Sequence, residues 1–250
     1  MISAIVPFMN SNPARLASFY FTMDWIRSAY KGVGEIIVVM QGEPVKVPDY
    51  VTMIPLETDC PLMLKAACVN LGAAKAKGDM LLIHDSDTVL PGLPESPDEK
   101  TMLVPLKAQS ALGLPDTLEL LEKGFSNNFR DWAKRGRRRF GESPGGVNLI
   151  SKSLFNKAGG FDELHVGHGG QDYDFAQRVR TAGGRVVFPK DHYDVGIHLW
   201  HPIDTRGMLF KKDADAKAAI AADKRMAAVV GKKLPFMPMQ DRFEAILAKF

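Results

Sequence analysis

Met80-Leu81-Leu82-Ile83-His84-Asp85-Ser86-Asp87 is an apolar run that ends on two acidic residues. A short apolar run bounded by turn-forming residues is typical of a buried β-strand. Because side chains of an extended chain alternate, Asp85 and Asp87 are expected to point to the same side. An Asp-x-Asp pattern alone is equally compatible with a turn rich in Asp and Ser. The stretch therefore predicts a strand whose carboxyl end carries either a functional site or a tight turn.

Strand and helix patterns alternate around this stretch. Asn12 and Pro13 fit the N-cap and first residue of a helix, and apolar residues follow at helical spacing to Ile26. This alternation predicts an α/β fold with a parallel sheet and right-handed crossovers. The predicted strands are Ile2–Phe8, Glu35–Gln41, Val51–Leu56, Met80–His84, Met102–Leu106 and Val186–Pro189, with ordered structure resuming over Gly145–Ser151. Further helices are predicted over Asp59–Lys77, Leu114–Lys123, Gln171–Ala182, Met208–Val230 and Gln240–Lys249.

The composition is that of an ordinary globular protein. The chain has 250 residues, 46% hydrophobic and 24% charged, with a net charge of +3. Disordered, fibrous and low-complexity classes are therefore excluded, and no apolar run is long enough to predict a membrane-spanning helix. No signal peptide is visible, and two cysteines are too few for a disulfide scaffold, so a cytoplasmic protein is predicted. We expect one domain over residues 1–205 and a C-terminal helical extension over residues 206–250.

Positive charge is concentrated in one segment. Residues 123–139 contain seven Lys or Arg residues and one acid, a net charge of +6, so the rest of the chain is slightly acidic. Phe125, Phe129, Trp132 and Phe140 are interspersed with these cations. Aromatic rings among cations suit stacking on nucleobases combined with phosphate contacts. A solvated surface with no partner is the alternative.

Two further strings are rich in Gly, His and Asp. The first is Gly159-Gly160-Phe161-Asp162-Glu163, followed by His168-Gly169-Gly170-Gln171-Asp172-Tyr173-Asp174 at the start of a predicted helix. A structural turn followed by a helix-capping residue would require fewer Gly, His and Asp residues than this string contains, so a purely structural role explains it less well. The second is His198-Leu199-Trp200-His201, whose imidazoles favour Mn²⁺ or Zn²⁺ over Mg²⁺. A zinc site made of histidines alone stays open, although no cysteine pair supports it.

Taken together, these motifs carry a family resemblance. They are Asp85-Ser86-Asp87, residues 145–163, residues 167–184 and His198-Leu199-Trp200-His201, in that order. They resemble nucleotide-sugar glycosyltransferases of the GT-A fold, especially the β-1,4-galactosyltransferase-like group and the catalytic region of polypeptide N-acetylgalactosaminyltransferases. The resemblance covers residues 2–202. It implies a Rossmann-like, mixed, mostly parallel sheet flanked by helices, and sugar transfer from a nucleotide diphosphate sugar, with UDP favoured.

The resemblance also implies roles for single residues. Asp87 and His201 would bind Mn²⁺ or Mg²⁺, with Asp85 and His198 as further ligands, and Asp172 would be the catalytic base. Asp85 would also contact the ribose or sugar. The nucleotide sugar would lie against Pro7, Phe8, Arg15, Lys65, Asn70, Asp85, Ser86 and Gly146. The acceptor would lie against His168, Gly169, Gly170 and Gln171, and the basic segment would add Trp132, Arg135, Arg137, Arg138 and Arg139.

Three positions depart from the family pattern. Gln171 stands where the family has Glu, so Asp172 is the one ionisable carboxylate that remains of this pair. His168 stands in place of the aromatic residue of the galactosyltransferases, and His198 in place of their Met. We therefore expect the acceptor to differ from theirs.

These residues predict a displacement mechanism. A cation on Asp87 and His201 would neutralise the leaving diphosphate, and Asp172 would take the proton of the acceptor hydroxyl. One displacement inverts the anomeric centre, although the fold also admits a retaining route. The predicted acceptor is a hydroxylated or hydroxymethylated pyrimidine of DNA, flipped into the pocket as in phage-type DNA modification. A glycan, protein or lipid-linked acceptor on an anionic surface is one alternative, and an inactive carbohydrate-binding module is another.

Overall fold

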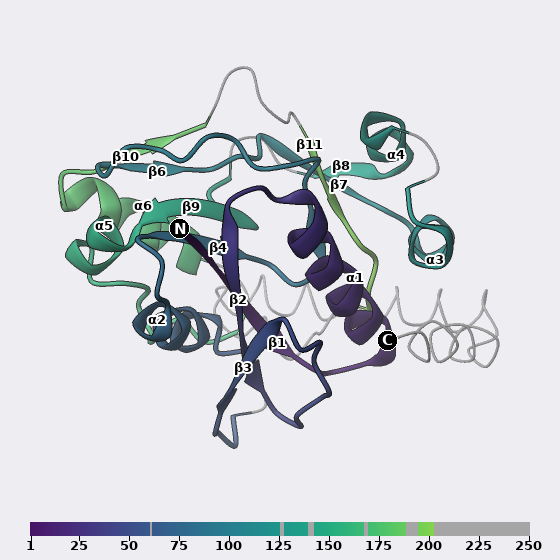
Figure 1. Cartoon of the computed structure of the whole chain (residues 1–250), viewed down its shortest axis with the longest axis horizontal. Helices are drawn as coiled ribbons and strands as arrows, with labels where there is room; N and C mark the ends of the chain where they lie inside the picture. Colours follow the sequence, from purple (N-terminus) through teal and green to yellow (C-terminus); the bar gives the residue numbers. More distant parts are fainter. Residues whose placement is uncertain (61, 126–127, 140–142, 168–169, 189–194, 203–250) are drawn as a thin grey trace, which may run out of the picture.

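The structure, a computed structural model, describes residues 1–202 except 61, 126–127, 140–142, 168–169 and 189–194. It contains a seven-stranded sheet with helices on both faces and a second sheet of four strands (Figure 1). Among the described residues, no helix combines the length and the apolar character needed to cross a bilayer. The helices predicted over 208–230 and 240–249 lie outside the described residues, so the C-terminal extension stays a prediction.

The large sheet has the strand order β10-β6-β9-β4-β1-β2-β3. Neighbours are parallel in the pairs β1–β2, β1–β4, β2–β3 and β6–β10, whereas β9 runs antiparallel to β4 and β6. The prediction of a mixed, mostly parallel sheet flanked by helices is therefore confirmed. The strands are β1 (Ile2–Met9), β2 (Val33–Gln41), β3 (Val51–Leu56), β4 (Met80–His84), β6 (Thr101–Leu103), β9 (Val147–Ser151) and β10 (Arg185–Val187).

Side-chain alternation along these strands builds two core layers. On β1, Val6 and Phe8 face one layer and Ile5 faces the other. Both layers are apolar, which is why the strands appear in the sequence as continuous apolar runs. One helix covers the first layer, and three helices cover the second (Figure 1). They are α1 (Pro13–Ala29) on the first, and α2 (Lys65–Lys75), α5 (Lys152–Lys157) and α6 (Gln171–Thr181) on the second.

The sequence did not predict the small sheet. Its strand order is β5-β11-β7-β8, and its apolar side packs on two helices and on part of α1. Trp132 is completely buried at the centre of this packing. The elements are β5 (Thr88–Val89), β7 (Ala108–Ala111), β8 (Arg137–Arg139), β11 (Val195–His198), α3 (Leu114–Lys123) and α4 (Phe129–Arg135).

Two predicted helix starts have different outcomes. The start of α1 is confirmed: Pro13 occupies the first turn, and the Asn12 side chain accepts a hydrogen bond of 2.9 Å from the Arg15 backbone N–H. The start of α2 at Asp59 is wrong, because the helix begins at Lys65.

The Gln41 side chain explains this late start. Its amide donates to two backbone carbonyls and accepts from one backbone N–H just before α2, at 2.7–2.8 Å. These backbone groups would otherwise pair within an earlier helical turn. They belong to Cys60, Leu62 and Leu64.

Candidate active site

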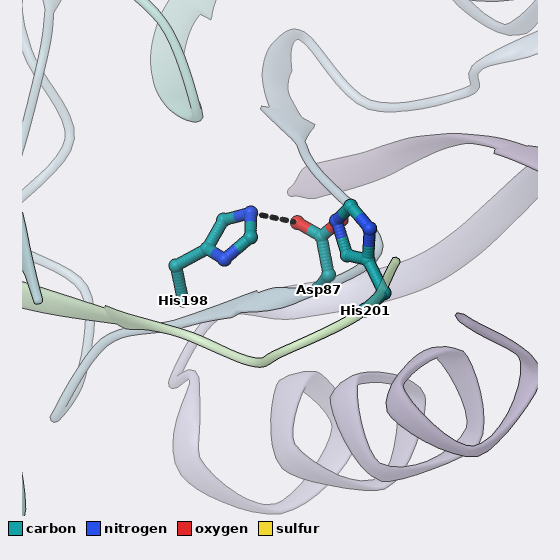
Figure 2. A group of neighbouring side chains, drawn as sticks. All are labelled: Asp87, His198 and His201. Atoms are coloured by element: carbon teal, nitrogen blue, oxygen red, sulfur yellow. Dashed lines mark ion pairs between the residues drawn. The ribbon is translucent and has the colours of Figure 1, made fainter. Parts of the chain in front are cut away.

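Asp87, His198 and His201 form a group of side chains that could hold a metal ion. Their ligand atoms all lie within 4.8 Å of one another. The Nε2 atom of His201 is 3.1 Å from Asp87 Oδ2, and that of His198 is 3.6 Å from Asp87 Oδ1. Figure 2 shows both imidazole rings turned toward the Asp87 carboxylate. The structure thus brings together three of the four predicted metal ligands.

The small sheet creates this group. His198, the last residue of β11, pairs with Thr88 of β5 and with Ala111 of β7. The next residue, Leu199, donates its backbone N–H to the Asp87 carbonyl at 2.8 Å. These pairings place the histidine segment against the turn that follows β4, which no local sequence pattern reveals.

The donor set fits a divalent cation. The Nδ1 atom of His201 lies 2.9 Å from the Pro202 carbonyl, which can only accept, so Nδ1 carries the proton. The Nε2 lone pair then faces the Asp87 carboxylate, and two acceptors at this distance need a proton or a cation between them. A histidine whose other nitrogen donates to a carbonyl is the usual arrangement of a metal ligand. One carboxylate and two imidazoles suit Mn²⁺ better than Mg²⁺.

The ionisation states agree with this role. Burial disfavours the charged form of Asp87, but the positive charge of the His198 and His201 imidazoles when they are protonated, together with that of Arg15, outweighs it, so the pKa of this carboxyl lies far below its usual range. Burial lowers the pKa of His198 and keeps its imidazole neutral at neutral pH. An ionised carboxylate and a neutral imidazole are the forms that bind metals.

A cavity of about 490 Å³ opens beside this group. Its volume lies in the range of small-molecule sites. Asp172 and Lys65 form part of its wall, as do the three side chains of the metal-binding group. Twelve residues predicted for the site line it: Pro7, Arg15, Lys65, Asp85, Ser86, Asp87, Arg139, Gly146, Gln171, Asp172, His198 and His201.

Lys65 connects two carboxylates of this cavity. Its Nζ lies 2.9 Å from Asp85 Oδ1, and 3.1 and 3.3 Å from the two oxygens of Asp172. Asp85 is therefore an ion-pair partner of Lys65, and it stands apart from the Asp87–His198–His201 group. A metal-binding role of Asp85 stays a prediction, whereas its ion pair with Lys65 is what the described residues show.

The surroundings of Asp172 favour a basic carboxylate. Burial raises the pKa of Asp172, Lys65 opposes this increase, and the negative charge of Asp85 adds to it. Two carboxylates in turn raise the pKa of Lys65 despite its burial, so its ammonium stays charged. Gly145 leaves room for the carboxylate, since a Cβ there would lie 3.1 Å from Asp172 Oδ2.

Two residues predicted to bind the nucleotide sugar have structural roles instead. Phe8 is buried in the core, where its ring stacks on Phe19 at 4.3 Å between centroids. The Asn70 amide accepts from the Phe161 backbone N–H and donates to the Phe161 carbonyl, both at 2.9 Å. It thereby holds the turn at Gly160, whose φ is +66°. Neither side chain is among the described residues that line the cavity.

The aromatic residues of the basic segment are also placed differently from the prediction. Trp132 is buried, and Phe125 and Phe129 pack with it against Trp25 of α1. Arg135 lies over the Trp132 ring and pairs with acidic residues of α3. Trp132 is therefore core and cannot stack on a base, while Phe125 and Phe129 are half-buried by their packing with it. Phe140 lies outside the described residues.

The remaining predicted acceptor residues have mixed outcomes. Arg139 lines the cavity, whereas Arg137 and Arg138 are exposed on β8 outside it. Gly170 is the N-cap of α6. His168 and Gly169 lie outside the described residues.

Sequence reasoning missed several cavity residues. Gln109 lies on β7, a strand of four residues with no clear alternation, and a Cβ on Gly146 would lie 2.6 Å from its Nε2. Lys107 and Trp200 also line the cavity. Only Trp200 had a usable signal, its place between His198 and His201.

A second group that could hold a metal consists of Asp162, His165 and Asp174. Arg178 already pairs with both carboxylates, at 2.8 Å from Asp162 and 2.6 Å from Asp174. The guanidinium supplies the positive charge there, and the pairing fixes the turn before α6.

Comparisons with known proteins agree with the fold. A family profile described as the N-terminal domain of galactosyltransferase matches residues 133–202. A search of curated protein sequences found no match. The catalytic domain of Drosophila β1,4-galactosyltransferase 7 in complex with xylobiose is 19% identical, with a TM-score of 0.50, covering 76% of this chain and 65% of that one.

Two other solved structures give the same result. A mutant of the Drosophila enzyme in complex with manganese, UDP-Gal and xylobiose is 17% identical, with a TM-score of 0.53, covering 87% of this chain and 78% of that one. GalNAc-T7 with UDP, GalNAc and Mn²⁺ is 15% identical, with a TM-score of 0.55, covering 80% of this chain and 44% of that one. The chain thus spans only part of the length of each.

These comparisons define the fold of the chain. The mixed sheet with an acidic turn after β4 is similar to the GT-A fold of the solved galactosyltransferase structures, as predicted. Within that fold, the resemblance to galactosyltransferases and to N-acetylgalactosaminyltransferases is confirmed.

Proposed function

We propose that the protein is a metal-dependent glycosyltransferase that moves a sugar from a UDP-sugar to an acceptor hydroxyl. The observation that carries this proposal is one cavity lined by both the Asp87–His198–His201 group and the buried carboxylate of Asp172. Such a cavity would bring a cation for a diphosphate and a base for a hydroxyl into one substrate site. The UDP and Mn²⁺ bound to the similar structures support the choice of donor and metal.

Asp87, His198 and His201 would hold the metal, and Mn²⁺ is the cation that their donor atoms favour. When bound, it would neutralise the negative charge that develops on the leaving diphosphate. Arg15, close enough to lower the pKa of Asp87, lines the same side of the cavity and would add positive charge near the diphosphate.

Asp172 acts as the general base. It accepts the proton of the acceptor hydroxyl while the hydroxyl oxygen forms a bond to the anomeric carbon and the bond to the diphosphate breaks. Lys65 fixes the carboxylate in the cavity through its ion pair. A single displacement of this kind inverts the configuration at the anomeric carbon.

The test is sugar transfer by the full chain with Mn²⁺ and a panel of UDP-sugars. We expect Asp172→Asn to lower kcat by about 100-fold or more while UDP binding persists, because only the base is lost. Asp174→Asn is the matched control, since Asp174 lies on the same helix but pairs with Arg178 outside the cavity. Full activity of Asp172→Asn would remove the proposed base. Wild-type binding of UDP-sugar without transfer to any acceptor class would favour an inactive binding module.

For the acceptor, we propose a hydroxylated or hydroxymethylated pyrimidine in DNA. The support is β8, a strand at the edge of the small sheet whose three residues are exposed arginines. Arg137 and Arg139 share one side of the strand, roughly 7 Å apart, and Arg139 lines the cavity. The positive charge of these arginines would suit phosphates beside the cavity, and stacking on Trp132 is no part of the support because this ring is buried.

The acceptor test uses duplexes with 5-hydroxymethylcytosine or 5-hydroxymethyluracil, and nucleoside mass as the readout. We expect Arg137→Ala to weaken DNA binding and to lower the salt dependence by about one unit of slope. Arg138→Ala is the control, because Arg138 points to the other face of β8. No added mass on any nucleoside would overturn the DNA acceptor, and transfer to a glycan, protein or lipid-linked acceptor would replace it. A cytoplasmic location stays a prediction.

A further inference from the structure

Behind the metal-binding turn lies a buried chain of hydrogen bonds that the mechanism above does not use. The Nδ1 atom of His84 is 2.7 Å from the Asp85 carbonyl, and its Nε2 is 3.1 Å from the Tyr30 hydroxyl. The Tyr30 hydroxyl in turn accepts from the Leu90 backbone N–H at 2.9 Å. His84 is completely buried, and Tyr30 nearly so.

Chemistry fixes the direction of this chain. A carbonyl only accepts, so the Nδ1 atom of His84 carries the proton. The buried ring is neutral, so its Nε2 is the acceptor and the Tyr30 hydroxyl is the donor. Every buried polar group in the chain is then satisfied, and all bonds run from Leu90 to Asp85.

The two ends of this chain bracket the metal-binding carboxylate. Asp85 and Leu90 are the first and last residues of a segment that contains Asp87 and the short strand β5. The Trp25 indole also donates to the Leu90 carbonyl at 2.6 Å, so side chains at the end of α1 hold both backbone groups of Leu90. The end of helix α1 thereby supports this segment through Trp25 and Tyr30, which are not among the described residues that line the cavity.

We propose that Tyr30 and His84 are positioning residues that hold the segment from Asp85 to Leu90 and so place the Asp87 carboxylate for metal binding. This inference rests on the proposed metal site. It requires that loss of the Tyr30 hydroxyl weakens the site without removing any ligand. Outer partners of metal ligands change metal affinity by about 10–100-fold in other proteins.

The test compares Tyr30→Phe with Tyr20→Phe. Tyr20 is also a buried tyrosine of the α1 region, and its hydroxyl donates to the Lys46 carbonyl, outside this segment. We expect Tyr30→Phe to raise the Kd for Mn²⁺, measured by electron paramagnetic resonance without donor, by about tenfold. Tyr20→Phe should leave this Kd unchanged at a similar loss of stability. Equal Mn²⁺ affinity of the two variants would overturn the proposal.

Hydrogen exchange gives a readout that does not depend on metal. The Leu90 amide should exchange faster in Tyr30→Phe than in Tyr20→Phe. Equal exchange rates in the two variants would contradict the proposal that the Tyr30 hydroxyl holds Leu90. If the wild type binds no Mn²⁺, the proposed metal site and the positioning role of Tyr30 and His84 toward it are both overturned. Faster Leu90 exchange in Tyr30→Phe would then show only that the chain of hydrogen bonds exists. Should Tyr30→Phe fail to fold, His84→Leu interrupts the same chain and is measured in the same two ways.

Discussion

Lys65 connects charged side chains that lie far apart in the sequence. Its ammonium contacts Asp85 and Asp172, and 107 positions separate it from Asp172. Burial raises the pKa of Asp172 more than Lys65 lowers it, and the negative charge of Asp85 adds to the increase, so Asp172 is a stronger base than a carboxylate in water. The family resemblance predicted each of these residues as part of the site, but no spacing rule could have predicted the ion pair.

Substitution of Lys65 tests this arrangement. In Lys65→Met the cation that lowers the pKa of Asp172 is lost, so this pKa rises and more of the base is protonated. We expect kcat/KM to fall by roughly tenfold or more, with its acid limb moved to higher pH, in profiles from about pH 5 to pH 9. Lys65→Arg keeps the positive charge, so its acid limb should lie at the same pH as that of the wild type. An unshifted limb in Lys65→Met, with folding verified by urea denaturation, would contradict the role of the ion pair.

Among the helices, α2 contacts the large sheet at Gly72. For Gly72→Ala, helix propensity favours a more stable protein, whereas the close packing at this position favours a less stable one. A Cβ at this position would lie 2.5 Å from Ile5 Cγ2 of β1. Alanine gains about 1 kcal/mol of helix propensity, whereas overpacking of a core costs about 1–3 kcal/mol. Because Ile5 is fully buried and has little room to move, we expect Gly72→Ala to lower the free energy of unfolding in urea. Ala74→Gly, on the exposed face of α2, is the control that measures helix propensity alone. A higher free energy of unfolding in Gly72→Ala would contradict the prediction and show that Ile5 moves to relieve the close contact.

The two sheets differ in how much of them the sequence predicts. The central strands β1, β2 and β4 carry continuous apolar runs that are buried on both faces, and each was predicted. Strands β5, β7 and β8 have two to four residues, and β8 consists of arginines, so neither hydrophobicity nor periodicity marks them. Their pairing is a tertiary effect. The pairing of these strands with β11 brings His198 close to Asp87. The sequence could therefore indicate which residues are candidate ligands, but it could not predict how they are arranged.

The whole molecule is tied together at the cavity, because its lining comes from both sheets and from α1, α2 and α6. The metal-binding group joins the turn after β4 of the large sheet to β11 of the small one. A ligand bound there contacts both units at once. It therefore stabilises the folded chain as a whole by mass action, and not one element alone.

Thermal unfolding with Mn²⁺ and UDP measures this coupling. At a 100-fold excess over Kd the expected stabilisation is about 2.7 kcal/mol, or a rise in Tm of about 5–10 °C for a chain of this length. UDP without Mn²⁺ should give a smaller rise, and EDTA should reverse the effect of the metal. Asp87→Ala should abolish the Mn²⁺-dependent part, because the group loses its only carboxylate. Asp162→Asn, in the second acidic group, should keep it, since Arg178 already supplies the positive charge there. A shift that persists in Asp87→Ala and disappears in Asp162→Asn would move the metal site to the second group and separate it from Asp172.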